Sequence, residues 1–159
     1  MQNKIQQPFF YFLKIGFLAV SGSFIILFFQ ITIINDKGFL EYFLSIKRMQ
    51  LFSYYFNLHI FLSIILAPLV ETYIMIRLLK LRKYVNLSNM QLCFISAIFW
   101  GALHAIKGYS AILPVVWLFF WLSKSTIDWG GEKSVSFLLP WSIHGIYNSL
   151  IFVIFDIKY

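Results

Sequence analysis

The sequence predicts an all-α fold, a polytopic transmembrane helix bundle with about five spans and one interfacial helix. Hydrophobic residues make up 60% of the 159 residues and charged residues only 12%, a far more apolar composition than that of a soluble domain. Apolar runs, several of them long enough to supply the ~20 residues that cross a bilayer, alternate with short connections. Aromatic residues, 21% of the chain, suit lipid-facing surfaces and interfacial belts. We therefore expect residues 1–159 to form a single membrane-embedded domain.

The apolar runs and the turn signals between them set the expected order of elements. Between the first two spans, Glu41, Lys47 and Arg48 stand among aromatic residues, as in a helix that lies along the membrane surface, here expected at residues 38–48. The sequence NLSN at residues 86–89 is a good N-cap cluster for the third span. The expected spans are residues 9–34, 51–79, 90–105, 109–122 and 136–154.

The second span carries a single formal charge, Glu71, within the apolar run of residues 49–76. A carboxylate at bilayer depth costs about 3 kcal/mol on insertion scales, so it normally faces a bundle interior or a water-filled cavity. Pro68 lies one turn before Glu71 and predicts a kink, because proline frees a backbone carbonyl one turn upstream. His59, on the same span, is expected to support packing or an interface.

The net charge of +7 lies almost entirely in the connections. Basic loops of a membrane protein set its orientation and bind anionic headgroups, so this charge predicts contact with the lipid bilayer and no nucleic-acid partner. Counting Lys and Arg on alternate sides places the N-terminus inside. The majority side holds Lys4, Arg77, Lys80, Arg82, Lys83, Lys124 and Lys133, and the other side Lys37, Lys47, Arg48, Lys107 and Lys158. Cys93, the only cysteine, is expected to be a small core residue rather than a nucleophile.

Four polar residues fall at similar depths in three different spans. At ~1.5 Å per residue, Glu71, His104 and the pair His144 and Asn148 lie within a helix turn or two of the same level. His144 and Asn148 are four apart and share one helix face, and Gly145 allows close helix contact. Each residue alone is more simply interpreted as a packing residue. Together they predict one polar site, because a glutamate, two histidines and an amide can activate a water and hold an oxyanion.

Three short motifs around these residues resemble those of the CPBP family of intramembrane proteases, which includes CAAX prenyl endopeptidases and Abi-like bacteriocin-processing or immunity proteins. PLVET (residues 68–72) is similar to the family's glutamate motif, IFWGALHA (98–105) to its FxxxH motif and HGIYN (144–148) to its HxxxN motif, all within residues 67–155. Thr72 replaces the second glutamate of EExxxR, Arg77 lies one residue beyond the expected arginine, and Trp100 stands in place of Phe. We expect these three residues to support the site, Thr72 through a hydroxyl bond to a backbone carbonyl one turn earlier.

The resemblance implies that Glu71 and His104 activate a water and that His144 and Asn148 stabilise the oxyanion. The chain would then be an endopeptidase of a bacterial cytoplasmic membrane, hydrolysing a peptide bond in a membrane-associated peptide or protein substrate. We favour a mechanism without a metal or other cofactor, because the chain has no HExxH motif. Zinc held by Glu71, His104 and His144 is the alternative.

Two further functions stay open. A catalytically silent relative would bind a partner or confer bacteriocin immunity, and Thr72 in place of the second glutamate favours this interpretation. A membrane redox protein would use His104 and His144 as the two axial ligands of a haem, which leaves Glu71 and Asn148 without a role. The distances among Glu71, His104 and His144 are the observation that most narrows the choice.

Overall fold

The computed structural model describes residues 6–33, 58, 60–105, 111–130 and 133–156, and every regular element within these ranges is helical. The expected interfacial helix at residues 38–48 and the expected packing role of His59 lie outside the described residues. In chain order the elements are α1 (Gln6–Ile33), the π-helical segment η1 (Leu62–Leu66), α4 (Ala67–Lys80), the short 3-10 helix η2 (Leu81–Tyr84), α5 (Asn89–His104), α6 (Ile112–Asp128) and α7 (Lys133–Asp156). The all-α prediction is confirmed for this part of the chain.

Three helical stretches are long and apolar enough to cross a membrane: Pro8–Gln30, Leu62–Lys80 and Ser134–Ile154. They correspond to the first, second and fifth expected spans. Helices α5 and α6 have 16 and 17 residues, fewer than the ~20 that cross a bilayer without thinning it. The structure thus supports a membrane helix at three of the five expected places.

Two helix ends show how local side chains set the boundaries. Ser88 caps α5, because its hydroxyl accepts the backbone N–H of Gln91 and the Gln91 side chain accepts the backbone N–H of Ser88. This confirms the predicted N-cap cluster. Helix α6 runs to Asp128 rather than ending near residue 122 as expected. Lys124 stabilises the extra turn through a 2.8 Å salt bridge to Asp128, four residues on.

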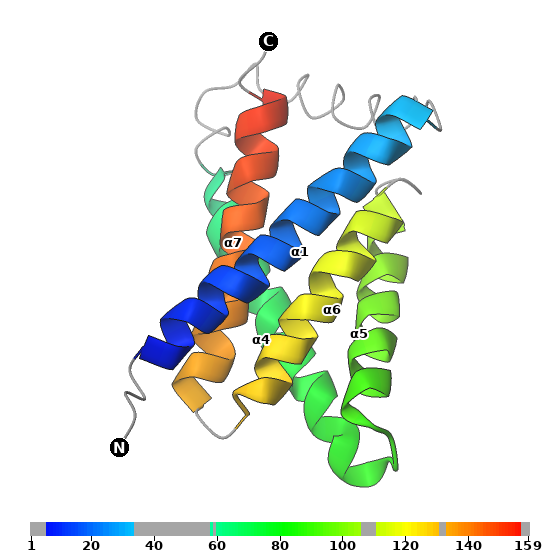
Figure 1. Cartoon of the computed structure of the whole chain (residues 1–159), viewed down its shortest axis with the longest axis vertical. Helices are drawn as coiled ribbons and strands as arrows, with labels where there is room; N and C mark the ends of the chain where they lie inside the picture. Colours follow the sequence, from blue (N-terminus) through cyan, green and yellow to red (C-terminus); the bar gives the residue numbers. More distant parts are fainter. Residues whose placement is uncertain (1–5, 34–57, 59, 106–110, 131–132, 157–159) are drawn as a thin grey trace.

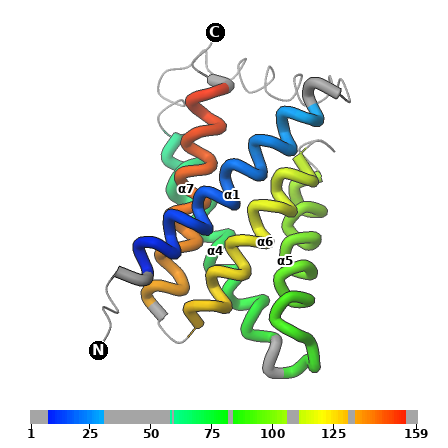
Figure 2. Tube along the Cα trace, viewed as in Figure 1, coloured from blue at the N-terminus to red at the C-terminus, as the bar shows by residue number. Residues whose placement is uncertain are grey.

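The described helices run alternately up and down and pack as an antiparallel bundle (Figure 1). Helix α1 crosses α6 and α7, while α5 lies along α6 on the opposite side from α7 (Figure 2). Helix α7 also contacts both η1 and α4. The α4–α7 contact is the one that concerns the polar residues, since Glu71 lies on α4 while His144 and Asn148 lie on α7.

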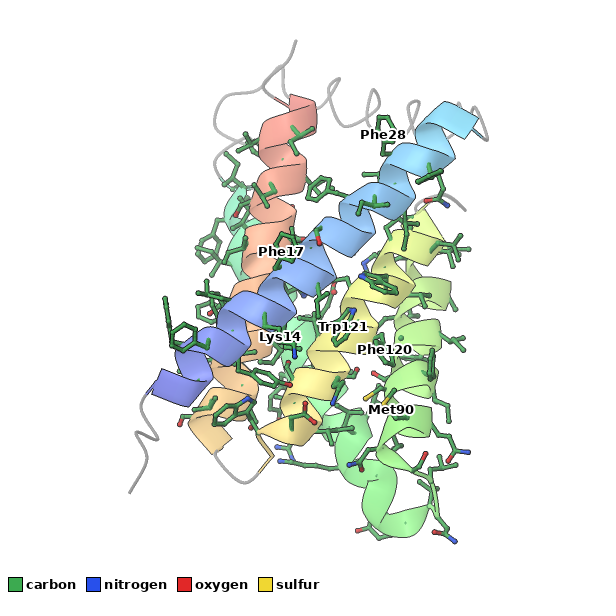
Figure 3. All side chains as sticks on the ribbon, viewed as in Figure 1. Lys14, Phe17, Phe28, Met90, Phe120 and Trp121 are labelled. Carbon is green, nitrogen blue, oxygen red and sulfur yellow. The ribbon has the colours of Figure 1, made fainter. Side chains whose placement is uncertain are left out.

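Large apolar side chains are exposed on the outer surface of the bundle, whereas several hydroxyl groups are buried between helices. Phe17 and Phe28 on α1 are 72% and 65% exposed (Figure 3). In contrast, the fully buried Ser23 donates to the carbonyl oxygens of Ala19 and Pro114, and buried Ser123 donates to Ser96 across the α5–α6 contact. A large apolar outer surface needs an apolar environment, and buried hydroxyls paired between helices are typical of helices packed within lipid.

Gly22 allows close contact between α1 and α6. The Trp117 indole lies over it and donates to the Leu18 carbonyl oxygen at 2.8 Å, and a Cβ on Gly22 would meet Trp117 Nε1 at 2.0 Å. A side chain at position 22 therefore has to displace the indole. Gly16, six residues earlier in the same helix, is different, because a Cβ there would meet only Ile143 Cγ1 at an ordinary 3.7 Å.

Gly22→Ala should lower the free energy of unfolding by about 1–3 kcal/mol, because overpacking moves Trp117 and breaks its hydrogen bond. Gly16→Ala is the matched control and should be neutral or slightly stabilising, since alanine also favours the helix. Unfolding of the two variants in detergent measures the difference. Equal stability of the two would contradict the close packing at Gly22.

Candidate functional site

Glu71 and His144 lie next to each other inside the bundle although they are far apart in the sequence. Helix α4 buries Pro68, Thr72, Met75 and Leu79 along one stripe, which places Glu71 at the edge of that stripe. Its Oε2 is 3.7 Å from Nε2 of His144, and the two side chains are 18% and 4% exposed. The structure thus brings two of the four predicted site residues together in the interior, Glu71 with His144.

His104, the last residue of α5, is oriented by its own helix. Its Nδ1 lies 2.9 Å from the carbonyl oxygen of Trp100. Because a carbonyl oxygen only accepts, Nδ1 carries the hydrogen, and in the neutral ring Nε2 is then left with a lone pair. His104 therefore offers an acceptor nitrogen, the form that orients a water or takes a proton.

Phe119 of α6 connects the two histidines. Its ring centroid is 5.1 Å from that of His144 in an edge-to-face contact and 6.1 Å from that of His104. On another side the ring stacks on Trp100, with centroids 4.8 Å apart. Since both imidazoles touch the same ring, they are separated by less than two helix diameters, roughly 20 Å. The three predicted residues Glu71, His104 and His144 therefore belong to one region of the bundle.

Asn148 lies on the same face of α7 as His144 but contacts a different element. Its Nδ2 donates to the carbonyl oxygen of Ser63 in the π-helical segment at 2.8 Å, and the side chain is partly buried. The shared face of His144 and Asn148 on α7 is as predicted, with one residue directed to α4 and the other to η1. The amide expected to bind an oxyanion is here bonded to backbone.

The three supporting residues differ in their surroundings. Trp100 is 4% exposed and packs on Phe119. Arg77 points away from the buried stripe, is exposed, and donates from Nε and Nη2 to the hydroxyl of Tyr73 at 3.0 and 2.6 Å. The predicted hydrogen bond of Thr72 is wrong. Its hydroxyl is fully buried without a hydrogen-bond partner among the described residues, because the branched side chain packs into the core stripe rather than turning back on its own helix.

Several residues at the site are not apparent from the sequence motifs. Phe119 is one of 19 phenylalanines, and nothing in its neighbourhood marks it. Ser63 contributes only a main-chain oxygen. Trp141 donates from Nε1 to the carbonyl oxygen of Ile65 at 3.4 Å. Its spacing of three and seven residues from His144 and Asn148 is a signal that could have placed it on the same face.

A carboxylate beside an imidazole can take a proton from water and pass it on. Among the described ranges, no three His, Cys, Asp or Glu side chains come together closely enough to hold a metal ion. The haem alternative requires both imidazoles to face one iron. In the structure His144 directs Nε2 toward Glu71, and the Phe119 ring touches both histidines.

No protein-family model, curated protein or solved structure matches the chain. What can be said of its function therefore depends on the side chains of the site and on the short motifs that contain them.

Thr72→Val should raise the free energy of unfolding by about 1 kcal/mol, because it removes a buried hydroxyl that lacks a partner while it keeps the shape of the side chain. Thr72→Ser is the matched control. It keeps the hydroxyl and loses a packed methyl group, so it should lower stability by about 1 kcal/mol. Unfolding in detergent tests both variants. A loss of stability in Thr72→Val would mean that the hydroxyl has a partner and would restore its predicted role.

Proposed function

We propose that this chain is an intramembrane endopeptidase of the CPBP type, which hydrolyses a peptide bond in a membrane-associated peptide or protein substrate. The observation that carries the proposal is the 3.7 Å approach of the Glu71 carboxylate to the His144 imidazole inside an apolar bundle. A carboxylate and an imidazole at membrane depth are costly to bury and are functional more often than not. The three motifs add support because they contain all four polar residues in the family's order.

The proposed location is a bacterial cytoplasmic membrane with the N-terminus inside. Support for a membrane comes from the three long apolar helical stretches and from the exposed phenylalanines of α1. Helices α5 and α6 complete the bundle as short spans, around which the bilayer is locally thinner. The orientation follows from the larger number of Lys and Arg in the connections that would then face the cytoplasm.

In the proposed reaction Glu71 is the general base. It takes a proton from a water molecule, and the water oxygen forms a bond to the carbonyl carbon of the substrate. His104 orients that water through Nε2. His144 donates to the oxygen on which negative charge develops. When the C–N bond breaks, Glu71 returns the proton to the leaving amine nitrogen, so that the enzyme ends in its starting state without a cofactor.

Glu71→Gln should reduce cleavage by at least about 10²-fold, because the amide keeps the size of the side chain but cannot accept the proton. Folding should persist, since a neutral amide is cheaper to bury than a carboxylate. Cleavage of a membrane-tethered reporter by the reconstituted protein measures the effect. Asp128→Asn is the matched control, as it removes a carboxylate that pairs with Lys124 and Tyr11 outside the site, and it should keep full cleavage.

The catalytically silent alternative predicts the opposite outcome. If Glu71→Gln retained the biological activity of the wild-type chain, the protein would act by binding a partner or by conferring immunity, and the hydrolase proposal would be abandoned.

A further inference from the structure

The backbone between η1 and α4 leaves one carbonyl oxygen without a main-chain donor. The N–H of Ala67 bonds to the oxygen of Leu62, five residues back, in the π-helical pattern. In an α-helix that N–H would instead donate to the carbonyl oxygen of Ser63. In the π pattern the donor for Ser63 is residue 68, which is a proline without an N–H. Neither pattern therefore supplies a main-chain N–H donor for the Ser63 oxygen.

Asn148 supplies the missing donor. Its Nδ2 lies 2.8 Å from the Ser63 oxygen, and because a carbonyl oxygen only accepts, this contact also fixes which end of the amide faces η1. Gly145, one turn earlier on α7, allows the approach, since a Cβ there would meet the Ile64 oxygen at 3.2 Å. A carbonyl oxygen without a donor is costly in an apolar interior.

The bond also sets the position of His144. Asn148 and His144 are four residues apart on α7, and Ser63 and Glu71 are the residues that they meet on the neighbouring element. The Asn148–Ser63 bond holds α7 against η1 one helix turn from the contact between His144 and Glu71. A shift of α7 along η1 would change the 3.7 Å distance between His144 and Glu71.

We propose that Asn148 is a positioning residue, whose amide replaces the hydrogen bond that Pro68 cannot make and thereby holds His144 opposite Glu71. Its effect on cleavage rests on the proposed function, whereas its effect on helix packing does not. This differs from the role implied by the motif resemblance, in which the amide contacts the substrate oxyanion.

The test is a double-mutant cycle between Asn148→Leu and Pro68→Ala. Asn148→Leu keeps the bulk of the side chain and removes the donor. Its thermal midpoint in detergent should fall by about 4 °C or more, cleavage should fall about tenfold, and the ¹⁵N signal of His144 Nε2 should shift. Pro68→Ala restores a main-chain N–H, so the combined variant should recover the midpoint, the signal and the cleavage to near those of Pro68→Ala alone. Ser149→Ala is the matched control, because Ser149 donates only within α7, to Gly145, and it should change none of the three.

The outcomes distinguish a positioning role of Asn148 from direct contact with the substrate oxyanion. Failure of Pro68→Ala to restore the midpoint overturns the proposal. Recovery of the midpoint without recovery of cleavage also overturns it, since Asn148 then contacts substrate, for which a loss of roughly 10²–10³-fold is expected. If Asn148→Leu does not fold, recovery of folded protein in the combined variant supports the proposal and its absence refutes it. If even the wild-type chain does not cleave, the proposed function fails, while the midpoint and the His144 signal still decide the role of Asn148.

Discussion

The structure depends on how the main-chain groups of a helix that contains a proline find hydrogen-bond partners in an apolar environment. Pro68 removes one N–H from the stretch Leu62–Lys80, and the chain responds with a π-helical turn just before it. A turn of this kind needs hydrogen-bond donors for its freed carbonyl oxygens, and a neighbouring helix is one source of them. Helix α7 does so, with Asn148 and Trp141 donating to two of the main-chain oxygens of η1. The packing of α7 on η1 is thus a requirement of the backbone as well as of side-chain fit.

The polar residues of the interior follow from this contact. With α7 held at η1, His144 faces α4 at the level of Glu71, and the Phe119 ring contacts both His144 and His104. Trp100 stacks on Phe119, so that this pair of rings joins α5 to α6 beside the histidines. The π-helical turn, the two histidines and the carboxylate therefore lie in one region of the bundle.

Much of the fold could be predicted from the sequence, because the bilayer imposes long apolar runs and because Glu71, His104 and His144 stand out against them. Pro68 also marked the place where the helix is irregular. Whether the helix would kink or form a π-turn could not be predicted, because a proline is compatible with both. The two differ in which main-chain carbonyl oxygens lack a donor and can accept a hydrogen bond from α7. For the same reason the bond of Asn148 to Ser63 was not apparent: a main-chain oxygen has no signature in the sequence. Phe119 was missed because apolar residues carry no periodic signal in helices that are apolar on every side.

The claim on which this account depends is that Glu71 and His144 are in contact inside the bundle. Solid-state NMR of the protein in lipid bilayers, with ¹³C at Cδ of Glu71 and ¹⁵N at Nε2 of His144, measures the dipolar coupling between these two nuclei directly. The account predicts a clear coupling, consistent with the 3.7 Å between the carboxylate oxygen and the ring nitrogen. The absence of a coupling in folded protein would place the two side chains apart and would contradict both the site and the function proposed for it.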